Sequence, residues 1–296
     1  MIFDKHFYNV DVTNDYKLMN EDIMIIKNKN FNIKQIADSG QCFRMNPISD
    51  NKYSLIAFDR YIELEQLEDD LIEISCSEED YELIWKDYFH LDYDYGRIVD
   101  ELINGSDEFL REAAIYGSGI RILRQDSFEM LISFIISQNK NIPSIKNCIE
   151  RISETYGESY RDDKLNISYN AFPSPNELAK ARKEDLRALK LGYRDEYILG
   201  ASRAVAMGDL DLEKLKVSSH EEAIKALKTI KGIGDKVANC ISLFGLYHIE
   251  AFPIDVWMKR VLSEYYQDKF DPLRYKGYAG IVQQYMFYYI RHVHGI

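Results

Sequence analysis

Two glycines, Gly232 and Gly234, separate two stretches of helical spacing and constrain the fold of this chain more than any other feature. The first helix must stop at these glycines, and the second must start near Asp235. Apolar residues recur at helical spacing on both sides: Ala226, Leu227 and Ile230 before the glycines, and Val237, Ala238, Ile241 and Phe244 after them. The pattern predicts a helix-hairpin-helix over about residues 224–246.

The turn between these helices has the properties of a phosphate site. Glycine allows backbone conformations closed to other residues and lets another backbone come close. The first-turn amides of the second helix point outward without partners inside the helix, and they carry the positive end of its dipole. We therefore expect Gly232 and Gly234 to bind the sugar-phosphate backbone of DNA. A close crossing of two helices also explains a Gly-x-Gly, so the glycines alone do not distinguish a DNA-binding turn from a structural one.

Lys236 follows the turn directly and lies in the first turn of the second helix. The helix dipole and partial burial both favour the neutral amine, which is the form that attacks carbon. The neighbouring Asp235 acts in the opposite direction, because its carboxylate favours the charged form. This position fits a nucleophilic lysine, and it also fits a solvated lysine beside DNA phosphates.

Asp255 lies 19 residues after Lys236, in a Pro-Ile-Asp-Val context. It precedes an apolar-periodic segment at residues 256–265, so one interpretation is an ordinary helix N-cap. The alternative is an ionised carboxylate that faces Lys236, helps to activate the amine and stabilises positive charge on a sugar ring as a base departs. Carboxylates have this role in glycoside cleavage.

Charge is distributed unevenly along the chain. The net charge of −12 is unfavourable for a DNA-binding protein taken as a whole. Residues 1–116 hold 11 basic and 26 acidic residues, a net of −15, whereas residues 117–296 hold 26 and 23, a net of +3. The second part can therefore offer DNA a positive face, with modest and salt-dependent affinity.

The same boundary separates two structural patterns. Before it, three β-rich or alternating segments predict a small antiparallel sheet with helices around it: Tyr53–Phe58, Tyr61–Glu65 and Leu71–Cys76. After it, three sequences have the form of a capping box and start helices: those at Asp126, Ser174 and Ser219. We predict an α+β fold with a sheet domain at residues 1–116 and a helical region at residues 117–296 that contains the hairpin and the loop of Asp255.

Length and composition fit an intracellular enzyme, cytoplasmic if the source is prokaryotic. No apolar run approaches the roughly 18 residues of a membrane span, so no membrane association is expected. The N-terminal sequence MIFDKHFYNVDV has neither the basic start nor the apolar core of a signal peptide. The four cysteines are widely scattered without CxxC spacing, which predicts reduced thiols and no zinc site: Cys42, Cys76, Cys148 and Cys240.

The stretches GIGDKVANC and AFPIDVWMKR resemble the helix-hairpin-helix DNA glycosylase superfamily, and specifically its 8-oxoguanine DNA glycosylase branch. The resemblance extends over most of the chain through further motifs in the same order: DSGQCFR at 38–44, GIRILRQDSFEMLISFIISQNKNI at 119–142, LKLGYRDEYI at 189–198 and YAGIVQQYMF at 278–287. It implies a bifunctional enzyme that acts on double-stranded DNA containing 8-oxoguanine. Such an enzyme flips the damaged nucleotide out, releases the base and cuts the strand by β-elimination.

By this resemblance, Lys236 is the nucleophile that forms a Schiff base at C1′, and Asp255 is its carboxylate partner. The Gly40 carbonyl is expected to accept the N7 hydrogen that 8-oxoguanine has and guanine lacks. The remaining pocket matches have one function in common, which is to hold the flipped purine. Cys240 and Phe287 are expected to sandwich it and Gln283 to read its Watson-Crick edge. Considered without the family, Gly40 could equally be an ordinary turn glycine, and Cys240 and Phe287 could equally be core residues.

The resemblance assigns three residues to the strand opposite the lesion. Asn139 is expected to fill the vacated stack, Tyr193 to wedge beside it, and Arg194 to bond the orphaned base. Taken singly, these residues also fit a helix-end cap and two surface positions. Two departures from the family pattern stand out. Ser144 replaces a second arginine for the opposite cytosine, and Trp257 replaces a histidine that contacts phosphate.

Other functions remain open from the sequence. A related enzyme could remove alkylated bases or oxidised pyrimidines, but the alkyl-base branch generally lacks the hairpin lysine. Relatives for adenine and pyrimidine lesions usually carry a C-terminal four-cysteine iron-sulfur cluster, and no cysteine follows Cys240. A non-catalytic module that uses the hairpin only as a phosphate clamp belongs to a different class. We expect no cofactor and no metal ligated by side chains, and a monomer.

The missing arginine at Ser144 predicts a weaker preference for cytosine opposite the lesion. Without that arginine, fewer contacts distinguish cytosine from the other bases. Excision rates measured on duplexes that carry each of the four bases opposite 8-oxoguanine test this expectation. A steep preference for cytosine would contradict it.

Overall fold

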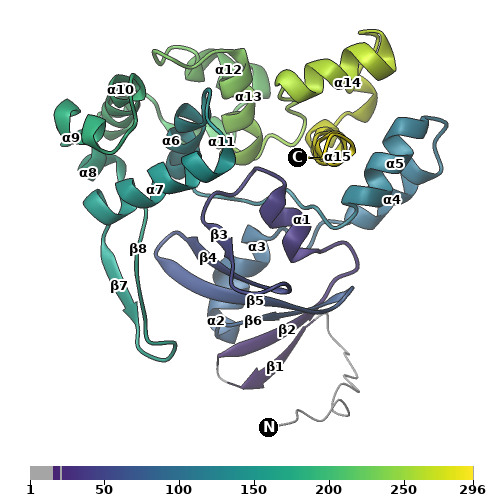
Figure 1. Ribbon diagram of the computed structural model, residues 1–296, viewed down its shortest axis with the longest axis horizontal. Coiled ribbons are helices and arrows are strands. Elements are labelled where there is room, and N and C mark those ends of the chain that lie inside the picture. Colours follow the sequence, from purple (N-terminus) through teal and green to yellow (C-terminus); the bar gives the residue numbers. More distant parts are fainter. Residues whose placement is uncertain (1–15, 21, 296) are drawn as a thin grey trace.

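The computed structural model describes residues 16–20 and 22–295. The N-terminal segment inspected for a signal sequence lies outside these residues. Among the described residues, no helix combines the length and the apolar character needed to cross a bilayer. The molecule consists of an antiparallel sheet with helices arching over one side of it (Figure 1). This arrangement confirms the predicted α+β class.

The sheet contains six strands in the order β1-β2-β6-β5-β4-β3, and every neighbouring pair is antiparallel. Their bounds are Tyr16–Asn20 (β1), Ile23–Lys27 (β2), Met45–Pro47 (β3), Lys52–Ala57 (β4), Arg60–Glu68 (β5) and Leu71–Ile74 (β6). Residues on β4 alternate between buried and half-buried, because successive side chains point to opposite faces. The three strands predicted from the sequence are β4, β5 and β6.

One face of the sheet packs on aromatic residues from short helices. The helix α1 (Ile33–Asp38) lies at the upper edge, and a helical run follows the last strand through α2 (Glu78–Asp80), a π-helical turn (Tyr81–Trp85) and α3 (Lys86–Tyr88). Within this core Trp85 and Phe89 are completely buried, and Phe31 contacts Phe89 edge to face at 5.2 Å. Large aromatic side chains therefore supply much of the apolar area that stabilises this small sheet.

The rest of the chain is mostly helical. The helices are α4 (Tyr95–Ile103), α5 (Glu108–Gly117), α6 (Ser127–Ser137), α7 (Ile142–Tyr156), α8 (Pro175–Ala179), α9 (Lys183–Ala188), α10 (Arg194–Ala206), α11 (Leu212–Lys216), α12 (His220–Leu227), α13 (Asp235–Phe244), α14 (Val256–Tyr266) and α15 (Ala279–Val293), with a 3-10 turn at Pro272–Tyr275. Residues 127–136 of α6 are all buried, so this helix forms the centre of the helical core. Both α10 and α13 pack against it.

The predicted helix starts are N-capped as expected. Ser174 and Ser219 each form a complete capping box with the glutamate three residues later. Asp126 accepts the amide of Glu129, but Glu129 lies buried in the core, and burial raises the pKa of its carboxyl to about 8. The third site is therefore a simple N-cap.

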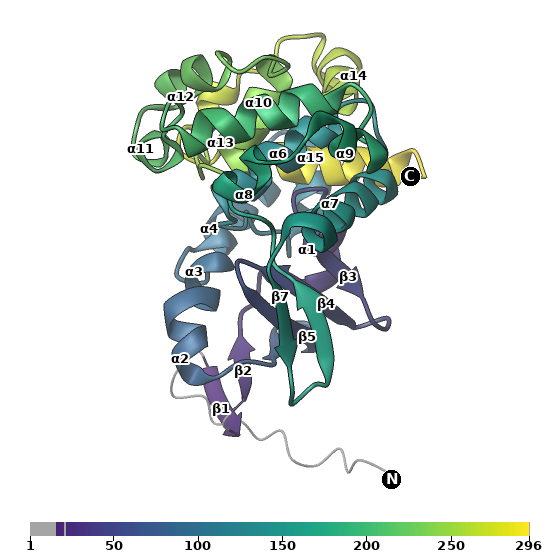
Figure 2. The ribbon, with the colours of Figure 1, turned by 90° about the vertical axis from the view of Figure 1, so that its left-hand side faces the viewer.

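One element of the second half was not predicted. Residues 159–170, which the sequence analysis assigned to a helical region, form a two-stranded hairpin of β7 (Ser159–Asp162) and β8 (Ile167–Asn170). Figure 2 shows this hairpin running alongside the sheet. Tyr169 contacts the ring of Tyr61 on β5, and its hydroxyl donates to the carbonyl of Asp59 at 3.0 Å. The expectation was wrong here because contacts with a distant strand stabilise the extended conformation.

The two cores do not follow the charge boundary. Side chains of α4 and α5 belong to the helical core, and α5 packs against the C-terminal helix α15. A half-buried ion pair joins the two halves. The buried Arg44, beside β3, binds Glu150 on α7 at 3.1 Å and donates to the carbonyl of Asn170 at 2.6 Å. The domain division at residue 116 stays a prediction.

The N-terminus of α15 touches the segment that leads to α14. The amide of Gly280 donates to the carbonyl of Ile249 at 2.8 Å. A Cβ on Gly280 would lie 2.9 Å from the carbonyl oxygens of both Ile249 and Ala251. Only glycine lets these two backbones approach this closely.

We predict that Gly280→Ala lowers the free energy of unfolding by about 1 to 3 kcal/mol, because the added methyl group must push backbone atoms apart. Gly200→Ala is the matched control, since Gly200 lies within α10 and its Cβ position has no atom within 4 Å. That change is expected to stabilise the protein by about 0.5 to 1 kcal/mol. Urea unfolding of both variants checks this, and equal stabilities would contradict it.

Candidate active site

The turn between α12 and α13 forms the predicted helix-hairpin-helix. Helix α12 ends at Leu227, so Ile230 lies in the turn and not on the helix as expected. Gly232 has φ +92°, and a Cβ there would lie 2.3 Å from the ring of Tyr197. The connection between the two helices is longer than the helical spacing suggested, because Lys228 already caps α12 and α13 starts only at Asp235.

Gly234 has a different role from Gly232. It is the N-cap of α13, its backbone is extended with φ −96°, and it makes no side-chain cap hydrogen bond. The space in front of it is open, because a Cβ added there would have no atom within 4 Å. The first amides of α13 can therefore receive an external anion.

Lys236 is half-buried on the first turn of α13. Its Nζ lies 5.9 Å from the centre of the Phe134 ring, and Phe134 stacks on Phe244 in the core. The competing carboxylate of Asp235 forms an ion pair with Lys228. The apolar wall of α6 thus faces the Lys236 amine, and Phe134 is a site residue that the sequence analysis did not single out.

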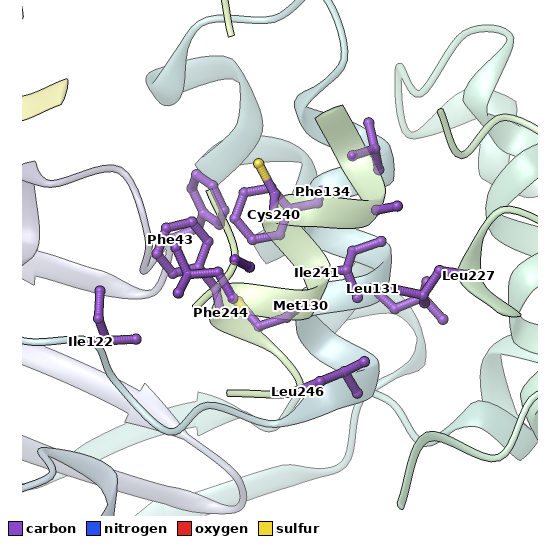
Figure 3. Packing of buried hydrophobic residues seen from close by; sticks show 14 of the residues in the cluster. Phe43, Ile122, Met130, Leu131, Phe134, Leu227, Cys240, Ile241, Phe244 and Leu246 are labelled. Carbon is purple, nitrogen blue, oxygen red and sulfur yellow. The ribbon is translucent and has the colours of Figure 1, made fainter. Parts of the chain in front are cut away.

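Cys240 lies one helical turn after Lys236 and is buried beside Phe134 (Figure 3). Burial raises the pKa of its thiol to about 11. The nearby Lys236 ammonium lowers this pKa and the Asp255 carboxylate raises it, both by less than burial. Cys240 is therefore a neutral thiol that lies close enough to Lys236 and Asp255 to interact electrostatically with both.

Asp255 is the N-cap of α14. Its Oδ1 accepts the amides of both Trp257, at 3.0 Å, and Met258, at 2.9 Å. The other oxygen, Oδ2, makes no hydrogen bond within the described part of the chain. The capping interpretation and the carboxylate interpretation are thus compatible, because one oxygen caps the helix and the other stays free.

Lys236 and Asp255 are brought to the same site without direct contact. Within residues 16–20 and 22–295 they form no ion pair at 4 Å or less. Both act on the Cys240 thiol, which lies within reach of the two charges. Lys236 and Asp255 therefore lie near the same thiol without forming an ion pair with each other.

Gly40 and Phe287 lie against each other and form a second wall of the candidate site. Gly40 has φ +78°, and a Cβ on it would lie 3.4 Å from the Phe287 ring. The loop is held by Gln41, which is completely buried, donates to the carbonyl of Arg121 at 2.8 Å and accepts the amide of Leu123 at 2.9 Å. The sequence analysis did not identify Gln41, whose role depends on contacts about 80 residues away.

Gln283 connects this wall to the loop of Asp255. It is buried one turn before Phe287 on α15, and its Nε2 donates to the carbonyl of Pro253 at 3.2 Å. Arg291 continues the same helix face. Its guanidinium lies 5.4 Å from the centre of the Phe287 ring and donates to the carbonyl of Asp38 at 3.1 Å.

The residues predicted for the opposite strand form a second group. Asn139 is exposed with φ +51° just after α6, and Tyr193 is 54% exposed at the start of α10. Arg194 was interpreted as a surface position if taken singly, but it is only 6% exposed. Its guanidinium lies over the Tyr193 ring at 4.5 Å and donates from Nε to the carbonyl of Gln138 at 3.1 Å. These contacts join Arg194 to Tyr193 and to the backbone of Gln138, the residue before Asn139.

The two departures from the family pattern lie at helix N-termini. Ser144 is in the first turn of α7, where its amide donates to Asn141 at 3.0 Å. Trp257 is in the first turn of α14, between the Arg260 guanidinium at 5.0 Å and the His294 ring at 5.5 Å. No cluster of three or more potential metal ligands among histidine, cysteine and acidic side chains occurs in the described residues.

The chain matches two family models that together cover most of its length. Residues 23–131 match the N-terminal domain of 8-oxoguanine DNA glycosylase, and residues 132–276 match the HhH-GPD superfamily of base excision DNA repair proteins. The structure superimposes with a TM-score of 0.87 on the Clostridium acetobutylicum 8-oxoguanine glycosylase/lyase bound to double-stranded DNA with cytosine opposite 8-oxoguanine. That protein is 35% identical, and the match covers 95% of this chain and 100% of that one. The chain belongs to the 8-oxoguanine DNA glycosylase family.

Relatives in this family include eukaryotic proteins. The N-glycosylase/DNA lyase OGG1 of Arabidopsis thaliana is 29% identical over 77% of this chain and 64% of its own length. The N-glycosylase/DNA lyase of Saccharomyces cerevisiae is 31% identical over 61% of this chain and 50% of its own length. The matched segments thus span about half to two thirds of these two glycosylases.

We predict that the two hairpin glycines respond differently to alanine. Gly232→Ala should lower the free energy of unfolding by about 2 kcal/mol or more, because its φ is positive and the methyl group meets Tyr197. Gly234→Ala should cost less than about 1 kcal/mol and instead weaken DNA binding, because the methyl group fills the space before the amides. Urea unfolding and fluorescence anisotropy measure the two effects. The same loss of stability in both variants would contradict the different roles assigned to Gly232 and Gly234.

Proposed function

We propose that this protein is a bifunctional DNA repair glycosylase, which excises 8-oxoguanine from duplex DNA and then cuts the strand. Family membership supports this proposal. The observation that carries it is the convergence of a half-buried lysine, a neutral thiol and a half-free carboxylate next to the helix-hairpin-helix: Lys236, Cys240 and Asp255. A phosphate clamp alone has no need for such a group behind its turn.

In the proposed first step, the Lys236 amine forms a bond to C1′ of the flipped nucleotide. The bond between C1′ and N9 breaks, and the base leaves with the electron pair and takes up a proton. Asp255 stabilises the positive charge that develops on the sugar through its free Oδ2.

In the second step, the amine nitrogen loses a proton and the C1′–O4′ bond breaks, with O4′ keeping the electron pair and taking up a proton, which gives a Schiff base. Loss of a proton from C2′ then expels the 3′ phosphate by breakage of the C3′–O bond, which is a β-elimination. Water hydrolyses the Schiff base and returns Lys236. Each step uses only the amine, proton acceptors and water, so neither a metal nor a cofactor is required.

The proposed lesion pocket lies between two walls. Phe287 and Cys240 would enclose the purine, and Gln283 would bind its Watson-Crick edge. The Gly40 carbonyl would accept the N7 hydrogen of 8-oxoguanine, whereas guanine would place a lone pair there, at a cost of about 1 to 3 kcal/mol. The anchoring of the loop through Gln41 supports this proposal, because a fixed carbonyl discriminates better than a mobile one.

The proposed contacts with the opposite strand come from the second group. Exposed Asn139 would enter the vacated stack and Tyr193 would wedge beside it. Arg194 would bond the orphaned base with the guanidinium N–H groups that its carbonyl contacts leave free. This requires either a small movement of Arg194 or approach of the base to its outer edge, since the side chain is buried in the free protein.

The proposal includes two properties of the whole molecule. We propose a monomer, because one chain supplies every residue of the proposed site, and light scattering tests this. We also propose that the protein acts inside the cell, in the compartment that contains DNA, because its substrate is duplex DNA. Localisation of a tagged full-length chain tests the second point.

We predict that borohydride traps a covalent adduct with duplex DNA containing one 8-oxoguanine opposite cytosine, and that Lys236→Gln abolishes this adduct. Borohydride reduces the Schiff base to a stable amine, and glutamine cannot form one. Lys231→Gln is the matched control, since Lys231 lies in the same turn but pairs with Glu196. Gel electrophoresis separates the adduct from free DNA.

The variants also separate the proposal from a DNA clamp. An enzyme with Lys236→Gln should retain DNA binding and lose turnover, whereas a clamp would lose affinity and show no turnover in any form. Absence of both adduct and base release with the wild-type protein would overturn the 8-oxoguanine proposal. Duplexes with alkylated or other oxidised bases would then be the next substrates.

A further inference from the structure

A relay of side-chain amides runs along the buried side of α15. Gln284 donates from Nε2 to Oε1 of Gln283 at 3.1 Å, and Gln283 donates from Nε2 to the carbonyl of Pro253 at 3.2 Å. Both glutamines are only 3% exposed. Pro253 lies two residues before Asp255, so the relay ends at the proposed catalytic loop.

The chemistry of the relay fixes the orientation of the Gln283 amide. A carbonyl oxygen can only accept, so the atom of Gln283 that faces Pro253 must be the nitrogen. The oxygen of Gln283 must then face Gln284, which donates to it. A rotation of the Gln283 amide by 180° would set two oxygens against each other at Pro253 and two N–H groups against each other at Gln284.

Gln284 has no other hydrogen bond that explains its burial. Its Oε1 is buried without a partner in the described part of the chain. A buried acceptor without a partner lowers stability and is uncommon in folded proteins. An apolar residue at this position would avoid that cost, so the one property that glutamine contributes is the N–H donated to Gln283.

The fixed amide leaves one N–H and one lone pair of Gln283 free for a ligand. The Watson-Crick edge of 8-oxoguanine presents an acceptor at O6 next to a donor at N1–H, which matches this pair. The edge of 8-oxoadenine presents a donor at N6 next to an acceptor at N1, which opposes it. The two lesions carry the same N7 hydrogen, so the Gly40 carbonyl does not separate them.

We propose that Gln284 is a positioning residue that sets the purine specificity of the lesion pocket. Through its hydrogen bond to Gln283, it holds the reading amide in the orientation that accepts a guanine-type edge and rejects an adenine-type edge. This inference rests on the proposed function, because it concerns the same pocket. It adds a residue that does not touch the substrate and that acts through Gln283.

The test compares single-turnover excision rates of 8-oxoguanine and 8-oxoadenine, each placed opposite the same base, for the wild type and Gln284→Met. Methionine has similar length and helix propensity but cannot donate to Gln283. We expect the ratio of the two rates to fall about tenfold, the factor that one hydrogen bond of ordinary strength supports. Gln284→Leu provides a second variant if the methionine variant folds poorly.

Tyr285→Phe is the matched control. Tyr285 is the next residue on α15, and its buried hydroxyl also has no partner among the described residues. This change removes a polar atom from the same helix without touching the relay, so the ratio should stay at the wild-type value. A merely structural loosening of α15 would lower both rates together and leave the ratio unchanged.

Two outcomes would overturn the inference, and they are distinguishable. In the first, the wild-type protein excises 8-oxoguanine and the ratio of the two rates is unchanged in folded Gln284→Met. This result would contradict the role of Gln284 but not the proposed function. A wild-type protein that releases neither base removes the proposed function and this inference with it. Thermal unfolding of each variant establishes which of them are folded.

Discussion

The close approach of α15 to the segment before α14 is the constraint on which the candidate site depends. Gly280 lets the first turn of α15 touch the carbonyls of Ile249 and Ala251. Because α15 carries Gln283 and Phe287, this contact sets the proposed lesion-binding wall relative to the loop of Asp255. Helix α13 meets the same region through its packing on α6. The contact at Gly280 thus sets the spacing between α15 and the loop of Asp255, and the packing of α13 on α6 adds Lys236 and Cys240 to the same region.

The division of charge gives the two halves of the molecule different relations to DNA. Acidic residues concentrate in the part that builds the sheet, whereas the hairpin and its neighbours are nearly balanced. Polyanionic DNA is repelled from the first part and tolerated by the second. The half-buried pair of Arg44 and Glu150 links the acidic half to helix α7. In the proposed enzyme, the sheet therefore supports the Gly40 loop, while the helices meet the nucleic acid.

Local patterns in the sequence predicted the parts of the fold that depend on local energetics. The hairpin, the capping serines at Ser174 and Ser219, and strands β4 to β6 follow from helical spacing, capping chemistry and alternation. The β7–β8 hairpin and the burial of Arg194 did not follow, because both depend on partners distant in the chain. The grouping of the candidate site residues came from resemblance to a family, since spacing alone also fits a turn, a cap and core positions.

Some site features could not be read from sequence because they depend on relations between side chains. The amide of Gln283 has a defined orientation only because Pro253 accepts from one end of it and Gln284 donates to the other. Similarly, Asp235 was expected to oppose a neutral Lys236, yet it pairs with Lys228 across the turn. Whether two charges compete depends on which rotamers the surrounding structure permits, and a residue list does not contain that information.

The two oxygens of Asp255 have separate tasks, and this separation links folding to chemistry at one position. Oδ1 holds the first turn of α14 through two amides, while Oδ2 makes no hydrogen bond among the described residues. Selection for a folded chain alone would accept asparagine, serine or threonine here, since each caps a helix. Selection for the reaction would accept only a group that caps with one atom and carries negative charge on another. Natural variation at this position would therefore distinguish chains that retain the chemistry from those that retain only the fold.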